Sequence, residues 1–177
     1  MKLFHFSDCP DLVLFEPRPV VVPAKRAPGR EWLNGPLVWA TDDWHSILYL
    51  FPRDCPRIVI WPTADTSQDD RKKWFDGRPC RAIALVERTW LERVAAAAIY
   101  RYDMPTTTFE DLGDTGMWVS RVPVSAALPT LLVDLPSQLA LYGVELRVLG
   151  SLAPLRGIWN STLHASGIRL RNAQDWN

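Results

Sequence analysis

The sequence predicts a single α+β domain over residues 1–177, built from short mixed and antiparallel strands with a few short helices. Its 177 residues are 47% hydrophobic and 23% charged, as expected for a globular chain of one-domain size. Fifteen prolines fix backbone φ and remove amide donors, so the elements must be short and the turns numerous. Several apolar runs are separated by gaps of hairpin length, which favours α+β over a regularly alternating parallel fold.

The first half of the chain contains four apolar runs, each ended by proline or by a polar turn. These runs predict strands over residues 2–6, 37–41, 57–61 and 81–86. Residues 15–36 contain five prolines and four basic residues around an apolar centre, and we expect a long proline-rich loop there.

Helix signals lie between these strands. Thr41, Asp42 and Asp43 offer N-cap chemistry for a helix over 44–51, which Pro52 would end. The polar stretch 63–76 is expected to be a surface excursion. After the fourth strand, a threonine and a glutamate three residues apart, at positions 89 and 92, have capping-box spacing and predict another short helix.

The second half alternates strands and helices. Strands are expected over 99–102, 116–120 and 144–149, and helices over 136–142 and 152–164. Gly143 stands at the C′ position of the first of these helices. The basic run 167–172 is expected to be an edge strand with Arg169 and Arg171 on one face.

Charge and cysteine content narrow the function classes. Twenty basic residues balance twenty acidic ones, so the net charge does not favour a nucleic-acid partner or an anionic membrane. His5 and Asp8 interrupt the apolar run that a secretory signal needs, and no stretch reaches the roughly 20 apolar residues that span a bilayer. We therefore expect a cytoplasmic protein. Three widely spaced cysteines suggest neither a disulfide framework nor a metal site.

Two features suggest ligand or partner binding. His5 and Ser7 lie two apart on the first strand, so their side chains share a face about 7 Å apart and can address two points of one ligand. The alternative for His5 is a half-buried, hydrogen-bonded side chain. Nine tryptophans and the proline-rich loop instead suggest a non-catalytic interaction module with an unknown protein partner.

Nearly the whole chain resembles a bacterial family known only as a domain of unknown function, and that resemblance implies no activity. The segments that carry it are Leu3-Phe4-His5-Phe6-Ser7, Trp39-Ala40-Thr41-Asp42, Phe51-Pro52-Arg53-Asp54-Cys55-Pro56-Arg57, Trp90-Leu91-Glu92-Arg93, Tyr100-Arg101-Tyr102, Val119-Ser120-Arg121 and Arg169-Leu170-Arg171-Asn172-Ala173.

More remotely, the order of elements resembles the ADP-ribosyltransferase fold, a split sheet that binds NAD. In that superfamily a His-x-Ser or His-x-Thr on the first strand contacts the NAD ribose and amide. The resemblance therefore implies that His5 and Ser7 bind the cofactor, that Thr41 lines the nicotinamide pocket and that Tyr49 stacks on the ring. The RNA- and DNA-modifying activities of the superfamily are a further possibility, which the neutral charge does not favour.

The resemblance also implies a catalytic glutamate at the start of a late strand, where negative charge stabilises an oxocarbenium-like transition state. Met117 stands at the matching position. Glu110, expected on a loop seven residues earlier, is the candidate replacement. The sequence thus leaves two functions open: an NAD- or nucleotide-binding, ADP-ribosyltransferase-like domain and a non-catalytic interaction module.

Overall fold

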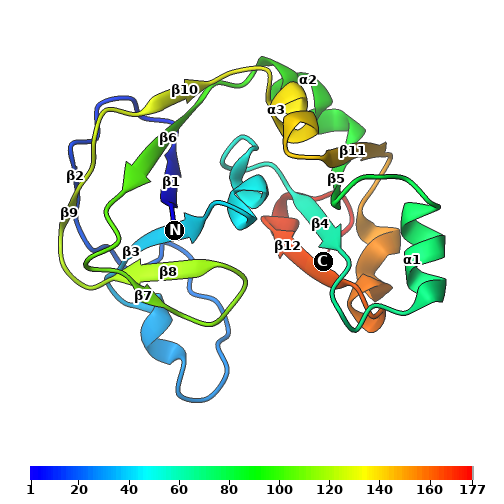
Figure 1. The fold of residues 1–177 in the computed structure, drawn as a ribbon, viewed down its shortest axis with the longest axis horizontal. Coiled ribbons are helices and arrows are strands. Elements are labelled where there is room, and N and C mark those ends of the chain that lie inside the picture. Colours follow the sequence, from blue (N-terminus) through cyan, green and yellow to red (C-terminus); the bar gives the residue numbers. More distant parts are fainter. Residues whose placement is uncertain (177) are drawn as a thin grey trace. The chain divides into compact units, whose positions relative to one another are not determined.

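The computed structural model describes residues 1–176, and the chain forms two compact units (Figure 1). Unit 1 comprises Met1–Ser46 and Ile99–Leu131, and unit 2 comprises Ile47–Ala98 and the chain from Leu132 onward. Each unit is therefore assembled from two stretches that are separated in sequence. Helices and mixed sheets together confirm the α+β class.

Unit 1 is organised around a six-stranded sheet with the order β10-β6-β1-β3-β8-β7. The central strand β1 runs antiparallel to both of its neighbours, β6 and β3. The strands are β1 (Leu3–Ser7), β3 (Val38–Asp42), β6 (Ile99–Met104), β7 (Glu110–Asp111), β8 (Met117–Ser120) and β10 (Thr130–Leu132).

The strand register assigns side chains to the two faces of this sheet, because directly opposed residues of antiparallel strands share a face. Leu3, opposite Met104, packs into a cluster with Phe15 and Val124. The last two residues come from the short antiparallel pair β2 (Leu14–Phe15) and β9 (Val124–Ser125), which lies beside the sheet in Figure 1. A second cluster packs around Val119 on the other face.

Unit 2 contains a four-stranded mixed sheet with the order β11-β5-β4-β12. The pair β5 and β11 is parallel, and the other neighbours are antiparallel. β4 is buried throughout, as its unbroken apolar run from Ile58 to Trp61 predicts. The strands are β4 (Arg57–Trp61), β5 (Ala82–Glu87), β11 (Val144–Leu149) and β12 (His164–Ile168).

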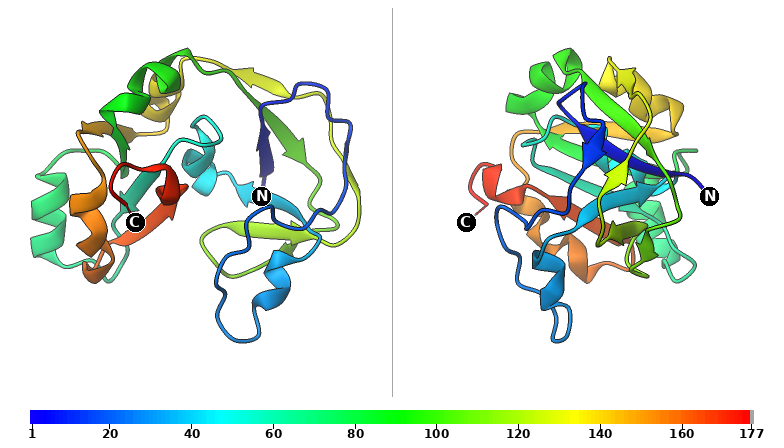
Figure 2. Two further views of the ribbon diagram at one scale, coloured as in Figure 1. Left: turned by 180° about the vertical axis from the view of Figure 1, so that it is seen from behind. Right: turned by 90° about the vertical axis from the view of Figure 1, so that its left-hand side faces the viewer.

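Short helices cover this second sheet. α1 and η4 pack on one face through Phe75 and Ile158, while α2 and α3 lie side by side (Figure 2). No helix among the described residues has the length and apolar character needed to cross a membrane. The α-helices are α1 (Gln68–Phe75), α2 (Leu91–Ala96) and α3 (Leu135–Leu141), and the 3-10 helices are η1 (Glu31–Asn34), η2 (His45–Tyr49), η3 (Arg88–Trp90), η4 (Ala153–Asn160) and η5 (Leu170–Asn172).

Four local expectations were wrong. The helices expected over 44–51 and 152–164 are the shorter 3-10 helices η2 and η4. The capping box at 89 and 92 does not form, because Trp90 occupies the N-cap of α2 without a side-chain bond. The surface excursion expected over 63–76 is mostly exposed, and it contains the helix α1. Of residues 167–172, only Gly167 and Ile168 belong to an edge strand, the end of β12, because Arg169 adopts φ 57° and η5 follows.

Two charged residues of unit 2 are buried in defined hydrogen-bond networks. Arg57 is 3% exposed and donates to the carbonyls of Leu48 and Cys55, both at 2.9 Å. Burial lowers the pKa of Arg57 to about 10 and raises the pKa of Cys55 to about 11, so Cys55 is a protonated structural thiol. Glu87, 2% exposed, accepts the amides of Leu152 at 3.1 Å and Gln174 at 3.0 Å.

Most tryptophans are half-buried, and arginines cover several of their faces. In the clearest example the Arg121 guanidinium lies 4.2 Å from the Trp32 ring centre. Trp61 is buried at 5% exposure, and Trp159 is exposed at 44%. The tryptophans thus contribute both to the core and to the surface, where arginine guanidinium groups stack on several of their rings.

Candidate functional site

Three of the five residues predicted from the sequence lie on the neighbouring strands β1 and β3: His5, Ser7 and Thr41. β1 pairs with β6 from Leu3 to Ser7, but with β3 only at Leu3 and Phe4. The last opposed pair is Phe4 and Thr41, and beyond it the two strands are no longer paired. We call this place, bounded by His5, Trp39 and Thr41, the β1–β3 opening.

His5 spans the opening. Its Nδ1 lies 2.8 Å from the carbonyl oxygen of Trp39. Since a carbonyl can only accept, Nδ1 carries a proton and donates it to this oxygen. The ring is half-buried and lies 4.8 Å from the ring of Phe15. This arrangement fixes both the tautomer and the orientation of His5.

Ser7 lies on the same face as His5, as the alternation along the strand predicted. It is 6% exposed, and its Oγ accepts the amide of Cys9 at 3.1 Å. The hydroxyl therefore helps to hold the turn that ends β1.

Thr41 lies on the opposite face, because it opposes Phe4 rather than His5. It is 2% exposed, and its Oγ1 has no hydrogen-bond partner within the described part of the chain. Two residues earlier on the same strand, Trp39 Nε1 is also buried and unpartnered among the described residues. Unsatisfied buried polar atoms are rare in proteins, and here two lie on one face of one strand.

Tyr49 and Glu110 lie outside this group. Tyr49 ends η2 and belongs to unit 2, whereas the other candidates belong to unit 1. Glu110 is in strand β7 rather than on a loop, and its Oε1 pairs with Arg121 Nε at 3.1 Å. Three strand spacings separate β7 from β1, which corresponds to about 14 Å. The structure thus does not bring Glu110 to the opening.

An aspartate–histidine pair at the end of β3 was missed in the sequence. Asp42 Oδ1 lies 2.8 Å from His45 Nδ1 and accepts the His45 backbone N–H at 2.8 Å. The Trp44 ring lies 4.7 Å from the imidazole, and Gly116 packs directly against the pair. A carboxylate at Nδ1 orients an imidazole so that Nε2 can exchange protons. The Asp-x-x-His spacing, read earlier only as N-cap chemistry, was the available signal.

No group of three or more metal-ligating side chains is positioned to hold an ion within the part of the chain that the structure describes. All three cysteines are unbridged.

Comparison with known proteins places the chain in a family. The model of a family of unknown function, DUF6886, matches residues 4–173. The chain belongs to this family. The expected resemblance to a domain of unknown function is thereby confirmed over nearly the whole sequence, including both stretches of each unit. No curated protein and no solved structure matched the chain.

Proposed function

We propose that this member of the family is an NAD- or nucleotide-binding domain of ADP-ribosyltransferase-like design, with its ligand at the β1–β3 opening. The observation that carries the proposal is the buried, unpartnered Oγ1 of Thr41 at the point where the two strands part. A buried hydroxyl without a partner costs stability, and such groups are often retained for a ligand.

The parting of the strands lets one ligand reach both faces of the sheet. A planar carboxamide inserted between β1 and β3 would lie in the plane of the sheet, between His5 on one face and Thr41 on the other. Its carbonyl would accept from the Thr41 hydroxyl, and the indole N–H of Trp39 is a second donor on the same face. Both atoms are covered, so binding requires the opening to widen.

His5 would supply the ribose contact. The bond from Nδ1 to the Trp39 carbonyl holds the imidazole at the place where β1 and β3 part, and histidine can both donate hydrogen bonds to and accept them from a ribose hydroxyl. We assign no catalytic role to Glu110, since it pairs with Arg121 at the sheet edge. The proposed activity is therefore ligand binding, with Asp42 and His45 as the nearest acid–base pair along β3.

The test is a thermal-shift titration with NAD, ADP-ribose and AMP on the wild type, His5→Ala, Thr41→Val and the exposed control Thr107→Val. A ligand at 100 times its Kd stabilises the fold by about 2.7 kcal/mol. We expect Thr41→Val to melt no lower than the wild type, because an unsatisfied hydroxyl is lost, and yet to lose the ligand-induced shift. Equal shifts in Thr41→Val and Thr107→Val would contradict the proposed site.

A second candidate function, the non-catalytic interaction module, is favoured by apolar side chains left exposed in unit 1. Val13, Val21 and Val22 are 71%, 98% and 52% exposed, the last two within the proline-rich loop. A protein that melts cooperatively but shows no shift with any of the three nucleotides would favour this function. Sedimentation of Val21→Asp against wild type would then test self-association.

A further inference from the structure

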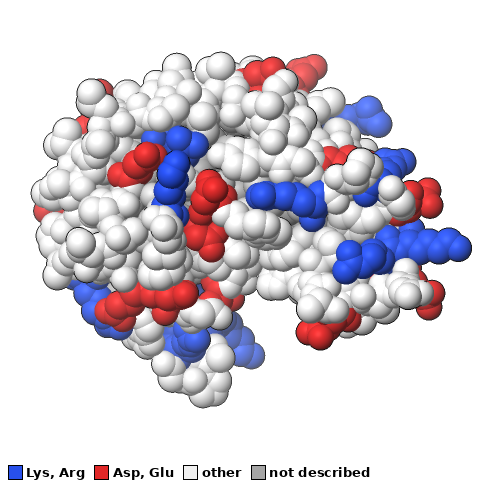
Figure 3. Space-filling model, in the orientation of Figure 1, with Lys and Arg blue, Asp and Glu red and all other residues white. Residues whose placement is uncertain are grey.

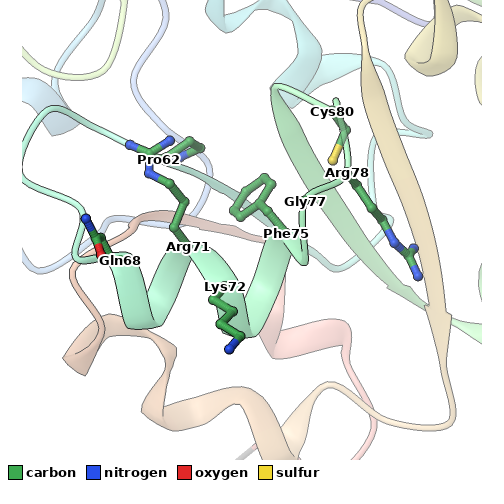
Figure 4. Close-up of a pocket in the computed structure, with 8 residues that line it drawn as sticks. All are labelled: Pro62, Gln68, Arg71, Lys72, Phe75, Gly77, Arg78 and Cys80. Atoms are coloured by element: carbon green, nitrogen blue, oxygen red, sulfur yellow. The ribbon is translucent and has the colours of Figure 1, made fainter.

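A pocket beside α1 in unit 2 is separate from the opening in unit 1. Its volume is about 480 Å³, in the range of small-molecule sites. Figure 4 shows the Phe75 ring near the centre and the Arg71 guanidinium beside Pro62, while the Lys72 and Arg78 side chains extend away from the ring. Two apolar side chains and three cations thus surround one hollow.

The helix that carries three of these residues is firmly held. Ser67 Oγ accepts the Asp70 amide at 3.1 Å and caps the N-terminus of α1. The Asp70 carboxylate accepts the Thr162 amide at 2.8 Å and the Thr162 hydroxyl at 2.7 Å, and these bonds lower the pKa of Asp70. α1 is thereby fastened to the segment before β12. Arg71 and Phe75, four residues apart, project from the same side of the helix.

The cations of the pocket are incompletely neutralised. Arg71 donates to the Thr63 carbonyl at 3.2 Å, and neither Arg71 nor Lys72 has a carboxylate partner among residues 1–176. Arg78 shares the carboxylate of Glu145 with Arg147. In Figure 3 Lys and Arg side chains gather at the side where Figure 1 places α1, with acidic side chains between them. Of the residues that line the hollow, three are cationic and none is acidic.

Arg78 also lines a second hollow of about 510 Å³, where three cations and two carboxylates are joined by Trp74. Trp74 Nε1 is buried and has no hydrogen-bond partner in the described chain. The thiol of Cys80 lies in the first hollow, and its pKa is raised by burial and by Glu145, so it adds no negative charge that would repel an anion.

We propose that the α1 pocket binds a small phosphate monoester whose organic group is apolar or aromatic. Guanidinium and ammonium donors match phosphate oxygens, and the Phe75–Pro62 floor matches a ring or an alkyl group. Arg71 and Lys72 hold the phosphate, and Arg78 closes the rim. The site does not depend on the NAD site of unit 1.

The test is calorimetric titration with phenyl phosphate and with inorganic phosphate. Arg71→Gln/Lys72→Gln removes two pocket cations, and the control Arg88→Gln/Arg93→Gln removes two exposed cations of unit 2 that lie outside both hollows. We expect phenyl phosphate to bind the wild type and the control equally, and the pocket variant at least about tenfold more weakly. His5→Ala should leave this binding unchanged, which separates this result from the NAD titration.

Three results would overturn the inference. Equal weakening by both double variants would indicate general charge attraction rather than a site. Equal affinities for phenyl phosphate and inorganic phosphate would show that the apolar floor of Phe75 and Pro62 does not contribute to binding. Absence of phenyl phosphate binding at roughly 10 mM ligand would exclude the site altogether. Melting curves of both double variants ensure that a loss of binding is not a loss of folding.

Discussion

Glu87 provides the sharpest test of the packing in unit 2. Its carboxylate is 2% exposed, and Oε1 accepts two backbone amides, from Leu152 at 3.1 Å and from Gln174 at 3.0 Å. Glu87→Ala leaves both donors without an acceptor. At about 1–3 kcal/mol for each donor left unsatisfied, the expected loss in the free energy of unfolding is about 2–6 kcal/mol.

Glu87→Gln distinguishes the hydrogen bonds from the volume of the side chain. A glutamine keeps one acceptor at the Oε1 position but places an NH₂ group near the Gln174 amide, which lies 3.1 Å from Oε2. We expect this variant to lose about 1–2 kcal/mol. The exposed control Glu92→Ala should stay within about 0.5 kcal/mol of wild type.

The assay is urea unfolding followed by circular dichroism, combined with hydrogen exchange at the two amides. Faster exchange of the Leu152 and Gln174 amides in Glu87→Ala would show that these particular bonds were lost. If Glu87→Ala and Glu92→Ala were equally stable, or if Gln and Ala at position 87 were equivalent, the hydrogen-bond account of Glu87 would be refuted.

Two further predictions concern Gly116 and Glu145. Gly116→Ala should lower the free energy of unfolding by about 2–4 kcal/mol, because an added Cβ would lie 2.1 Å from His45 Nδ1. The displaced His45 imidazole should be visible as a shift of its ring ¹⁵N signals. The control Gly113→Ala, with a similar φ of 61° and open space around it, should cost only the backbone strain of about 1–2 kcal/mol. The bond from Arg147 holds the pKa of Glu145 below its usual value. The ionised carboxylate therefore stabilises the fold at pH values above its unfolded pKa, and this contribution is lost as the pH falls through the folded pKa. In urea titrations, the free energy of unfolding of the wild type should exceed that of Glu145→Gln by about 1 kcal/mol at pH 7, and the difference should vanish in acid.

The buried strands were predictable because their signal is local. Residues 57–61 and 144–149 were predicted with the bounds that the structure shows: the first is a buried, mostly apolar run, and in the second, which is mostly half-buried, apolar and charged residues alternate. α1 was missed because its sequence is polar and lacks an apolar stripe. Its caps were the available signal: Ser67 precedes two acidic residues, and two lysines lie in its last turn.

The site could be predicted only in part, because its arrangement depends on long-range register. Alternation along one strand correctly placed His5 and Ser7 on one face. It gave no information on which residue of β3 opposes Phe4, and that pairing puts Thr41 on the other face. Likewise, Glu110 was expected on a loop, because a two-residue strand such as β7 forms only through its pairing with β8.

The interleaving of the two units has a consequence for biosynthesis. On the ribosome, β1 emerges well before β6, the neighbour with which it pairs along its whole length. The sheet of unit 1 cannot be completed until most of the chain has been synthesised. The sheet of unit 2 cannot be completed until β11 and β12 have been synthesised. A cut between Ala98 and Ile99 would leave each fragment with one of the two stretches of unit 1 and one of the two stretches of unit 2. Two such fragments, expressed separately, should regain structure only when mixed.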